Sequence, residues 1–318
     1  MALDPAALTL AFRRGQLDAL AATHLAKGGL YTAEMQQTLA LRLLGRAWQQ
    51  YREDRAITLG SRLVGAECAA ERDAFLALLT RALPSPRLPL MEAIRTVRRI
   101  AVAPLAAEAR QAAEIETQSM PQLDAVISTL DGGRLPTDPL ERLLALVNQH
   151  RYSLGPAGEA LGATAHSPCW AVNLLAIARP EAFGLCPLPL PCPAVAQRRL
   201  WRADLSSAAQ RSHACDGLLD ALHALSCDID RVWRASRRFQ DEFPQLRSHA
   251  RLGSAWMLMV GLGELTPAQL ARALPATKAG AGKLLRQLAE ARLIRAGGPF
   301  EPFNCNTLPA ASFAIDVA

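Results

Sequence analysis

Apolar residues recur at helical spacing along most of this 318-residue chain, and this periodicity restricts the fold more than any other feature. Spacings of three and four residues place side chains on one face of a helix. No run of alternating β-branched residues is present, as a half-buried strand would show. Alanine, leucine and arginine, which enter helices at little cost, dominate the composition. The sequence therefore predicts an all-α protein with helices over 32–54, 68–83, 89–105 and 136–150.

Helix caps and proline-rich breaks divide the chain. Thr32 is placed to cap one helix, and Thr137 or Asp138 precedes Pro139 at the start of another. The stretch FGLCPLPLPCPAV at 183–195 differs, because four prolines in seven residues exclude a helix and favour an extended connection. We expect a multi-helix module over 1–183, a proline-rich linker over 184–195, a connecting or dimerisation helix over 196–245 and a C-terminal domain over 246–318.

The composition favours a globular, cytoplasmic protein. Hydrophobic residues make up 50% of the chain and charged residues 20%. The longest apolar candidate, LGSAWMLMVGLG at 252–263, is too short to span a bilayer, and the N-terminus lacks the pattern of a secretion signal. Seven cysteines form no CxxC pair, so free thiols in a reducing compartment are expected. No membrane partner is expected.

The net charge of +6 is concentrated toward the C-terminus. Residues 1–195 hold 19 Lys and Arg against 18 Asp and Glu, whereas residues 196–318 hold 16 against 11. A basic C-terminal portion is a mild indication of a polyanionic partner.

A long helix is predicted at about 206–240. Six of its residues follow the alternating three- and four-residue spacing of an a/d seam, namely Cys215, Leu218, Leu222, Leu225, Ile229 and Val232. About two and a half heptads indicate either a homodimer through 214–232 or docking against a neighbouring helix of the same chain. The opposite face holds residue types that metal sites use, and these weak candidates are His213, Asp216, Asp220, His223 and Cys227. A solvated polar face is the simpler interpretation of this stripe.

The stretch PATKAGAGKLLRQL at 275–288 could be a phosphate-binding loop or a helix that lies on DNA. The loop motif requires glycine where this chain has Thr277, and serine or threonine where it has Leu284, so the loop is excluded. Two helices joined by a tight turn fit better, with Thr266 capping the first and Thr277 the second. In the second helix, the residues predicted to face inward are Ala281, Leu284, Leu285 and Leu288. Thr277, Lys278, Gly280, Gly282, Lys283 and Arg286 are left outward.

This stretch resembles the winged helix-turn-helix domain of bacterial transcriptional regulators of the MarR and GntR type, over about residues 250–305. The shared pattern is LTPAQLA entering the first helix, the capped ATKAGAGKLLRQLAEARLI, and a wing formed by AGGPFEP at 296–302. The resemblance implies that Thr277, Lys278, Gly280, Lys283 and Arg286 face the major groove and phosphates. It also implies that Arg295 and the wing reach an adjacent groove or the backbone.

A departure from that family concerns its function. Ala279, Gly280 and Gly282 offer no hydrogen-bonding side chain, so few groups can read bases. Such a helix would read DNA through phosphates and shape, or pack against another protein. We expect a DNA-binding transcriptional regulator or plasmid-maintenance factor, with a protein-interaction adaptor as the alternative and a metal-dependent helical enzyme as the third.

No catalytic signature is present, so no catalytic residue and no cofactor is expected. The sequence contains no G-x-S-x-G, no H-E-x-x-H and no dinucleotide-binding glycine motif after a strand. The partners that the sequence favours are double-stranded DNA, a second copy through 214–232, and a protein that the N-terminal module binds.

Overall fold

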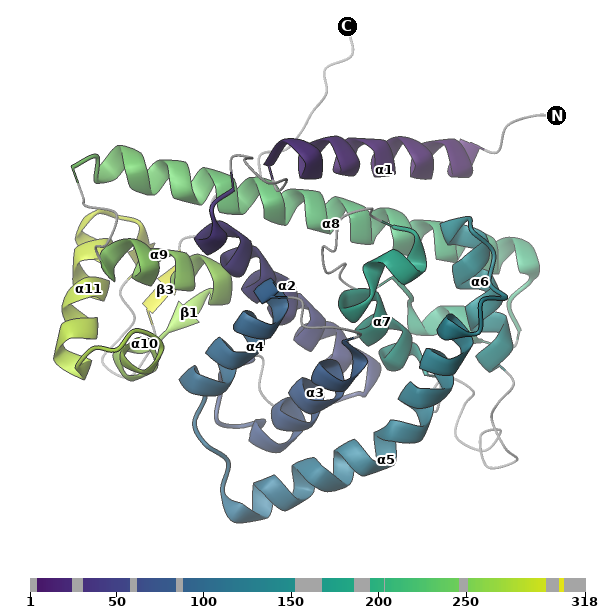
Figure 1. The fold of residues 1–318 in the computed structure, drawn as a ribbon, viewed down its shortest axis with the longest axis horizontal. Helices are drawn as coiled ribbons and strands as arrows, with labels where there is room; N and C mark the ends of the chain where they lie inside the picture. Colours follow the sequence, from purple (N-terminus) through teal and green to yellow (C-terminus); the bar gives the residue numbers. More distant parts are fainter. Residues whose placement is uncertain are drawn as a thin grey trace, which may run out of the picture. The chain divides into compact units, whose positions relative to one another are not determined.

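The computed structural model describes residues 5–24, 31–57, 62–83, 88–151, 168–185, 195–202, 204–245, 251–295 and 303–305. Over these ranges the chain is mostly helical, as the periodicity predicted (Figure 1). It forms two compact units, Met1–Ile229 (unit 1) and Asp230–Ala318 (unit 2), and the division falls within the long helix α8 (Ser207–Glu242). Residues 186–194 of the predicted proline-rich linker lie outside the described ranges.

The regular secondary structure in the described residues of unit 1 is helical. They are α1 (Pro5–His24), α2 (Ala33–Asp54), α3 (Ala69–Ala82), α4 (Leu88–Ile100), α5 (Ala106–Asp131), α6 (Pro139–Arg151), α7 (Cys169–Ala178), the short 3-10 helices η2 (Pro180–Phe183) and η3 (Arg198–Trp201), and the first part of α8. The predictions for α2, α3 and α6 are confirmed to within a few residues. The prediction of a helix to residue 105 is wrong, because Pro104 disfavours helical backbone at Ala103 and α4 ends at Ile100.

Side-chain caps fix where two of these helices begin. The Thr32 hydroxyl accepts a hydrogen bond from the Met35 amide at 3.2 Å, as predicted for the N-cap of α2. At α6, a carboxylate oxygen of Asp138 accepts from the amides of Leu140 and Glu141, both at 3.0 Å. Asp138 rather than Thr137 therefore caps α6.

The core of unit 1 surrounds α7, all ten residues of which are buried. A helix that is buried on every side must be enclosed by other elements, and α7 packs against α2, α3 and α5. Four aromatic side chains meet here with ring centroids 5.1 to 6.0 Å apart, namely Trp48, Tyr51, Phe75 and Trp170. Their offset and edge-to-face contacts anchor α7 to α2 and α3.

The predicted seam of α8 is buried within a single chain. All six residues, Cys215, Leu218, Leu222, Leu225, Ile229 and Val232, are at most 3% exposed. Close approach of the backbone at residue 195 requires Gly217, since a Cβ there would lie 2.9 Å from the Val195 carbonyl oxygen. Of the two alternatives that the sequence left open, the structure has the seam packed within its own chain. No second copy is needed to bury it.

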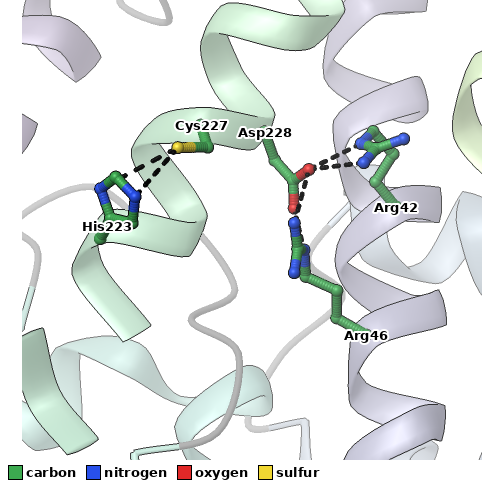
Figure 2. A network of polar contacts seen from close by, with 5 residues as sticks. All are labelled: Arg42, Arg46, His223, Cys227 and Asp228. Atoms are coloured by element: carbon green, nitrogen blue, oxygen red, sulfur yellow. Dashed lines mark hydrogen bonds and ion pairs between the residues drawn. The ribbon is translucent and has the colours of Figure 1, made fainter. Parts of the chain in front are cut away.

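Charged groups also hold α8 against α2 within unit 1. The carboxylate of Asp228, only 1% exposed, accepts from Arg42 Nε at 2.8 Å and pairs with Arg42 Nη2 at 2.7 Å. It also pairs with Arg46 on the next turn of α2, so two guanidinium groups enclose one carboxylate (Figure 2). At the start of α8, Gln210 donates to Asn148 of α6 at 3.0 Å.

Unit 2 combines the end of α8 with three further helices and a small sheet. Its elements are α9 (Arg251–Leu262), β1 (Glu264–Leu265), α10 (Pro267–Ala273), α11 (Lys278–Glu290), β2 (Ile294–Arg295) and β3 (Phe303–Cys305). The sheet is antiparallel with the order β1-β3-β2, and it pairs Leu265 with Phe303 and Ile294 with Cys305. Strand β2 follows α11, the second helix of the pair.

Helix α9 packs against the end of α8 in unit 2. Its residue Trp256 donates from Nε1 to the Ala235 carbonyl of α8 at 2.8 Å. A Cβ at Gly253 would lie 3.5 Å from the Phe239 ring, an ordinary contact that reflects close packing of α9 and α8. In the part of the chain that the structure describes, α9 included, no helix has the length and apolarity needed to cross a bilayer.

Candidate nucleic-acid interface

The two helices α10 and α11 begin at the N-caps that the sequence indicated. Thr266 and Gln269 form a capping box at α10, with the Thr266 hydroxyl accepting from the Gln269 amide at 3.2 Å and Pro267 in the first position. Thr277 caps α11 and accepts from the Gly280 amide at 3.1 Å. The turn between the helices is therefore fixed by local hydrogen bonds.

One face of α11 is buried against α10 and α9. Ala281, Leu285 and Leu288 are fully buried, as predicted, whereas Leu284 is only half-buried. Spacing of three and four residues accounts for this apolar stripe. Packing of that stripe determines which side chains of α11 point outward.

The outward face of α11 is cationic. Of the candidate residues on this helix, Thr277, Lys278, Lys283 and Arg286 are exposed and Gly280 is half-buried. Among the described residues, no acidic side chain forms an ion pair with Lys278, Lys283 or Arg286. Their charges are solvated and available to an external anion.

Gly282 differs from these residues in its exposure. It was predicted to point outward, but the structure buries it. A Cβ built there would meet only Arg286 Nη1, at 3.9 Å, so the arginine side chain covers the glycine. Because glycine has no side chain of its own, its exposed fraction depends on the side chains next to it. The periodicity alone does not predict how those side chains lie.

The last candidate residue, Arg295, is exposed at the end of β2. It follows a tight turn in which Arg292 adopts the left-handed conformation, with φ of 56°. The Leu293 amide donates to the Leu288 carbonyl at 2.9 Å, which closes the end of α11 in a Schellman motif. Arg295 pairs across the sheet with Asn304, and residues 296–302, predicted to form the wing, lie outside the described ranges.

The net positive charge of the chain belongs almost entirely to unit 2. Residues 230–318 carry 12 Lys and Arg against 7 Asp and Glu, a net charge of +5, whereas residues 1–229 carry 23 against 22, a net charge of +1. Two of the three lysines in the chain, Lys278 and Lys283, lie on the outward face of α11. The electrostatic attraction for a polyanion is therefore centred on unit 2.

The structure does not assemble the predicted stripe of α8 into a full metal site. Over the described ranges, no group of three or more His, Cys, Asp or Glu could hold a metal ion. Asp216 and Asp220 are exposed and His213 is half-buried. Only His223 and Cys227 come together, with Cys227 Sγ 3.6 Å from Nε2 of the imidazole.

A buried polar network in unit 1 was not predicted. The side-chain oxygen of Asn173 accepts from the amides of Val195 and Ala196, at 2.9 and 2.8 Å. Its amide group donates to the Ala196 carbonyl at 2.8 Å and to Asp54 at 2.9 Å. Asn173 on α7 thus connects α2 with the chain that follows the proline-rich stretch. Its partners lie far apart in the sequence, so no local spacing of residues predicts these hydrogen bonds.

Burial shifts two pKa values in this network. Desolvation raises the pKa of Asp54 from 3.8 to about 6, although the hydrogen bonds from Asn173 and Cys169 oppose the rise. The Cys169 thiol lies 3.6 Å from the Asp54 carboxylate, and burial raises the pKa of this thiol well above its usual range. A thiol with a raised pKa stays protonated and unreactive at neutral pH, so the network has a structural character.

Comparison of the chain with models of known protein families and with curated proteins finds no match. The interpretation of this interface therefore depends on its geometry and charge.

Proposed function

We propose that unit 2 is a winged helix domain that binds double-stranded DNA, and that the protein is a bacterial-type transcriptional regulator or plasmid-maintenance factor. The order of elements supports this assignment: a helix, a strand, two helices joined by a tight turn, and two further strands. The sheet order β1-β3-β2 supports it as well, since the chain returns after α11 to pair with β1 through β3. In a helix-turn-helix, the second helix of the pair enters the major groove, which here is α11.

The unpaired cationic face of α11 is the observation that carries the proposal. Lys278, Lys283 and Arg286 can contact phosphates without breaking an ion pair among the described residues. Each phosphate that they neutralise releases condensed counterions from the duplex, and this release favours binding at low salt. Arg295, exposed at the end of β2, extends the same charge toward the neighbouring backbone.

Contacts through the backbone add to this surface. The amides of Lys278 and Ala279 in the first turn of α11 have no acceptor within the helix, and such groups bind phosphate oxygens readily. Base reading is limited, because Ala279 and Gly280 bring no hydrogen-bonding side chain to the groove. Arg286 is the one candidate on this face with a guanidinium that could bind a guanine bidentately. Phosphate contacts and DNA shape would dominate recognition.

A homodimer through 214–232 stays a prediction of this proposal. Its apolar seam is buried within the chain, so a second copy would have to contact the exposed face of α8. If that dimer forms, the operator is expected to have two-fold symmetry, with half-sites about one helical turn apart. Sedimentation velocity of the full chain, with and without a bound duplex, measures this directly.

Salt-dependent DNA binding by a matched set of variants tests the function. Fluorescence anisotropy of the full chain with a pool of genomic duplex fragments, at about 50 and about 200 mM salt, should give tight, salt-sensitive binding that enriches one fragment. The variant Lys278→Ala/Lys283→Ala/Arg286→Ala should lose affinity for every sequence. Its plot of log affinity against log salt should be less steep by about one for each phosphate contact removed.

The control variant carries the same change in charge on unit 1. Arg98, Arg110 and Arg134 are exposed arginines of that unit, and their triple change to alanine should leave the salt dependence almost intact. If both triple variants lose affinity equally, binding depends on net charge and the placement of the recognition helix is wrong. Absence of binding by the parent protein would instead favour the protein-interaction alternative, in which the small residues of α11 pack against a partner.

A further inference from the structure

Two metal-binding side chains meet on the exposed side of α8. Cys227 Sγ lies 3.6 Å from Nε2 and 3.9 Å from Nδ1 of His223, one helical turn earlier. Both residues are exposed, and Figure 2 shows them on the side of α8 that points away from α2. Asp228, the next residue, points the other way to Arg42 and Arg46. Among the described residues, neither His223 nor Cys227 forms a hydrogen bond or ion pair that holds α8 against another helix.

Their separation matches that of two ligands of one tetrahedral ion. Zinc binds cysteine sulfur at about 2.3 Å and histidine nitrogen at about 2.05 Å, so a tetrahedral angle places the sulfur and the nitrogen about 3.5 Å apart. The observed 3.6 Å is close to this value. The two side chains are therefore within reach of the same ion, but because Sγ also lies 3.9 Å from Nδ1, the imidazole ring has to turn to direct a nitrogen lone pair at that ion.

We propose that His223 and Cys227 form a two-ligand site for a divalent metal ion of the zinc class. Thiolate with imidazole is a donor set that zinc prefers over oxygen ligands, whereas magnesium and calcium favour oxygen. The other residues of the predicted stripe do not join them, because the described residues hold no group of three or more candidate ligands. Two coordination positions therefore remain open to water or to an external ligand.

The packing of α8 supports pre-organisation of this pair. The carboxylate of Asp228 is held by two arginines of α2, and it immediately follows Cys227 in the chain. A site on a fixed helix loses less conformational freedom on binding than a site on a loop. Coordination replaces the S–H proton of Cys227, and this proton passes to solvent.

Titration of the reduced full chain with Co²⁺ tests this site, because Co²⁺ occupies zinc sites and a thiolate bound to it gives a charge-transfer absorption band. The parent should show the band with one ion per chain, and Zn²⁺ should displace it. Loss of a residue that only hydrogen-bonds a metal ligand already weakens metal binding roughly 10- to 100-fold. Cys227→Ser and His223→Ala each remove a ligand itself, so each should weaken Co²⁺ binding by at least that factor. The double variant should lose little more than either single variant, because the two ligands act on one ion.

The decisive comparison uses His223→Ala, which keeps all seven cysteines. If the other thiols bound the ion, this variant would retain the band, and that outcome would overturn the proposal. Asp216→Asn, an exposed stripe residue on the same helix, serves as the matched control and should bind as the parent does. Circular dichroism of each variant should match that of the parent, since the three changed residues are exposed or nearly so.

Discussion

Units 1 and 2 use their charged residues in opposite ways. Unit 1 is nearly neutral and buries part of its charge, whereas unit 2 has a net charge of +5 and leaves its lysines exposed. In unit 1, Asp228, Arg72 and Arg151 are each at most 8% exposed. In unit 2, the cations of α11 have no ion-pair partner among the described residues. Charge holds the fold of unit 1 together and remains available for a partner in unit 2.

The buried arginines show what charge does in unit 1. Arg72 is 1% exposed, and it pairs with Asp73 at 2.8 Å and donates to the carbonyls of Gly65 and Val102 at 3.1 and 3.2 Å. Such a group ties a loop to the core because an unpaired buried charge is costly. Removing Arg72 or Asp73 should therefore destabilise the fold, whereas removing an exposed cation of α11 should not.

The largest expected effect comes from breaking the Asp228 cluster. Asp228→Ala leaves two arginines of α2 without their carboxylate, and loss of one partner of a buried pair costs about 3–5 kcal/mol. We expect a loss of about 3 kcal/mol, at the lower end, because the Arg46 side chain is 39% exposed and can regain water. Hydrogen exchange of peptides from α2 and α11 along a urea series would assign the loss to each unit.

Two variants sharpen this prediction. Replacing the whole cluster, as Arg42→Met/Arg46→Met/Asp228→Leu, should restore most of the lost stability, because no charge is then left unpaired. The α11 triple variant of Lys278, Lys283 and Arg286 should change stability by no more than about 0.5 kcal/mol. A loss in the α11 variant as large as that in Asp228→Ala would contradict the contrast between the units.

The second prediction concerns Asp54, a carboxylate in the buried polar network of unit 1. Burial raises the pKa of Asp54 from 3.8 to about 6, which corresponds to about 3 kcal/mol of destabilisation when the group is charged. This destabilisation is fully present above the folded pKa of about 6 and disappears as the pH falls toward the unfolded value. We expect Asp54→Asn to stabilise the protein by about 2 kcal/mol at neutral pH, since the amide still accepts from Asn173 but adds a donor beside Cys169.

Urea unfolding of parent and variant at two pH values tests the sign. The advantage of Asp54→Asn should be largest near neutral pH and should shrink at about pH 4.5, where the parent carboxyl is protonated. The difference between the two proteins removes the contribution of other titrating groups. A variant that is less stable than the parent at neutral pH would show that the charged carboxylate supports the network instead of straining it.

Local signals in the sequence were sufficient for the elements with a cap and a regular apolar stripe. Thr32 and Thr277 cap α2 and α11 as predicted, and the long helix predicted at about 206–240 is α8. Helices α5 and α7 were missed for opposite reasons. Only four residues of α5 are buried and Pro121 lies within it, whereas all ten residues of α7 are buried, so neither shows an amphipathic period.

The same distinction applies to the candidate sites. The outward residues of α11 and the pair of His223 and Cys227 are set by spacing along one helix, which the sequence displays. The cluster of Asp228 joins residues more than 180 positions apart, and the hydrogen bonds of Asn173 reach Asp54 and Ala196 across 119 and 23 positions. Such contacts depend on how the helices pack, and nothing in the local pattern specifies them.

The smallest predicted effect separates fold from function within α11. Gly282→Ala should stabilise unit 2 by about 0.8–1 kcal/mol, because alanine is the better helix former and its Cβ would meet only the end of Arg286. Gly280→Ala should gain much less, because its Cβ would lie 3.2 Å from the Thr277 hydroxyl and crowd the cap. Thermal unfolding of unit 2, followed by hydrogen exchange of α11, would measure both changes.

DNA affinity should respond in the reverse order. Gly282 is buried beneath the Arg286 side chain, so an added methyl group there should leave binding unchanged, whereas a methyl group at the half-buried Gly280 would hold the first turn of α11 away from the duplex. Gly280→Ala should therefore weaken binding at a nearly unchanged salt dependence, because it removes no charge. If Gly280→Ala binds as tightly as the parent while the cationic triple variant does not, α11 contacts phosphates without close approach of its first turn. If neither Gly280→Ala nor the cationic triple variant affects DNA binding, the partner of the cationic face is something other than DNA. The difference in charge between units 1 and 2 is not affected by that outcome.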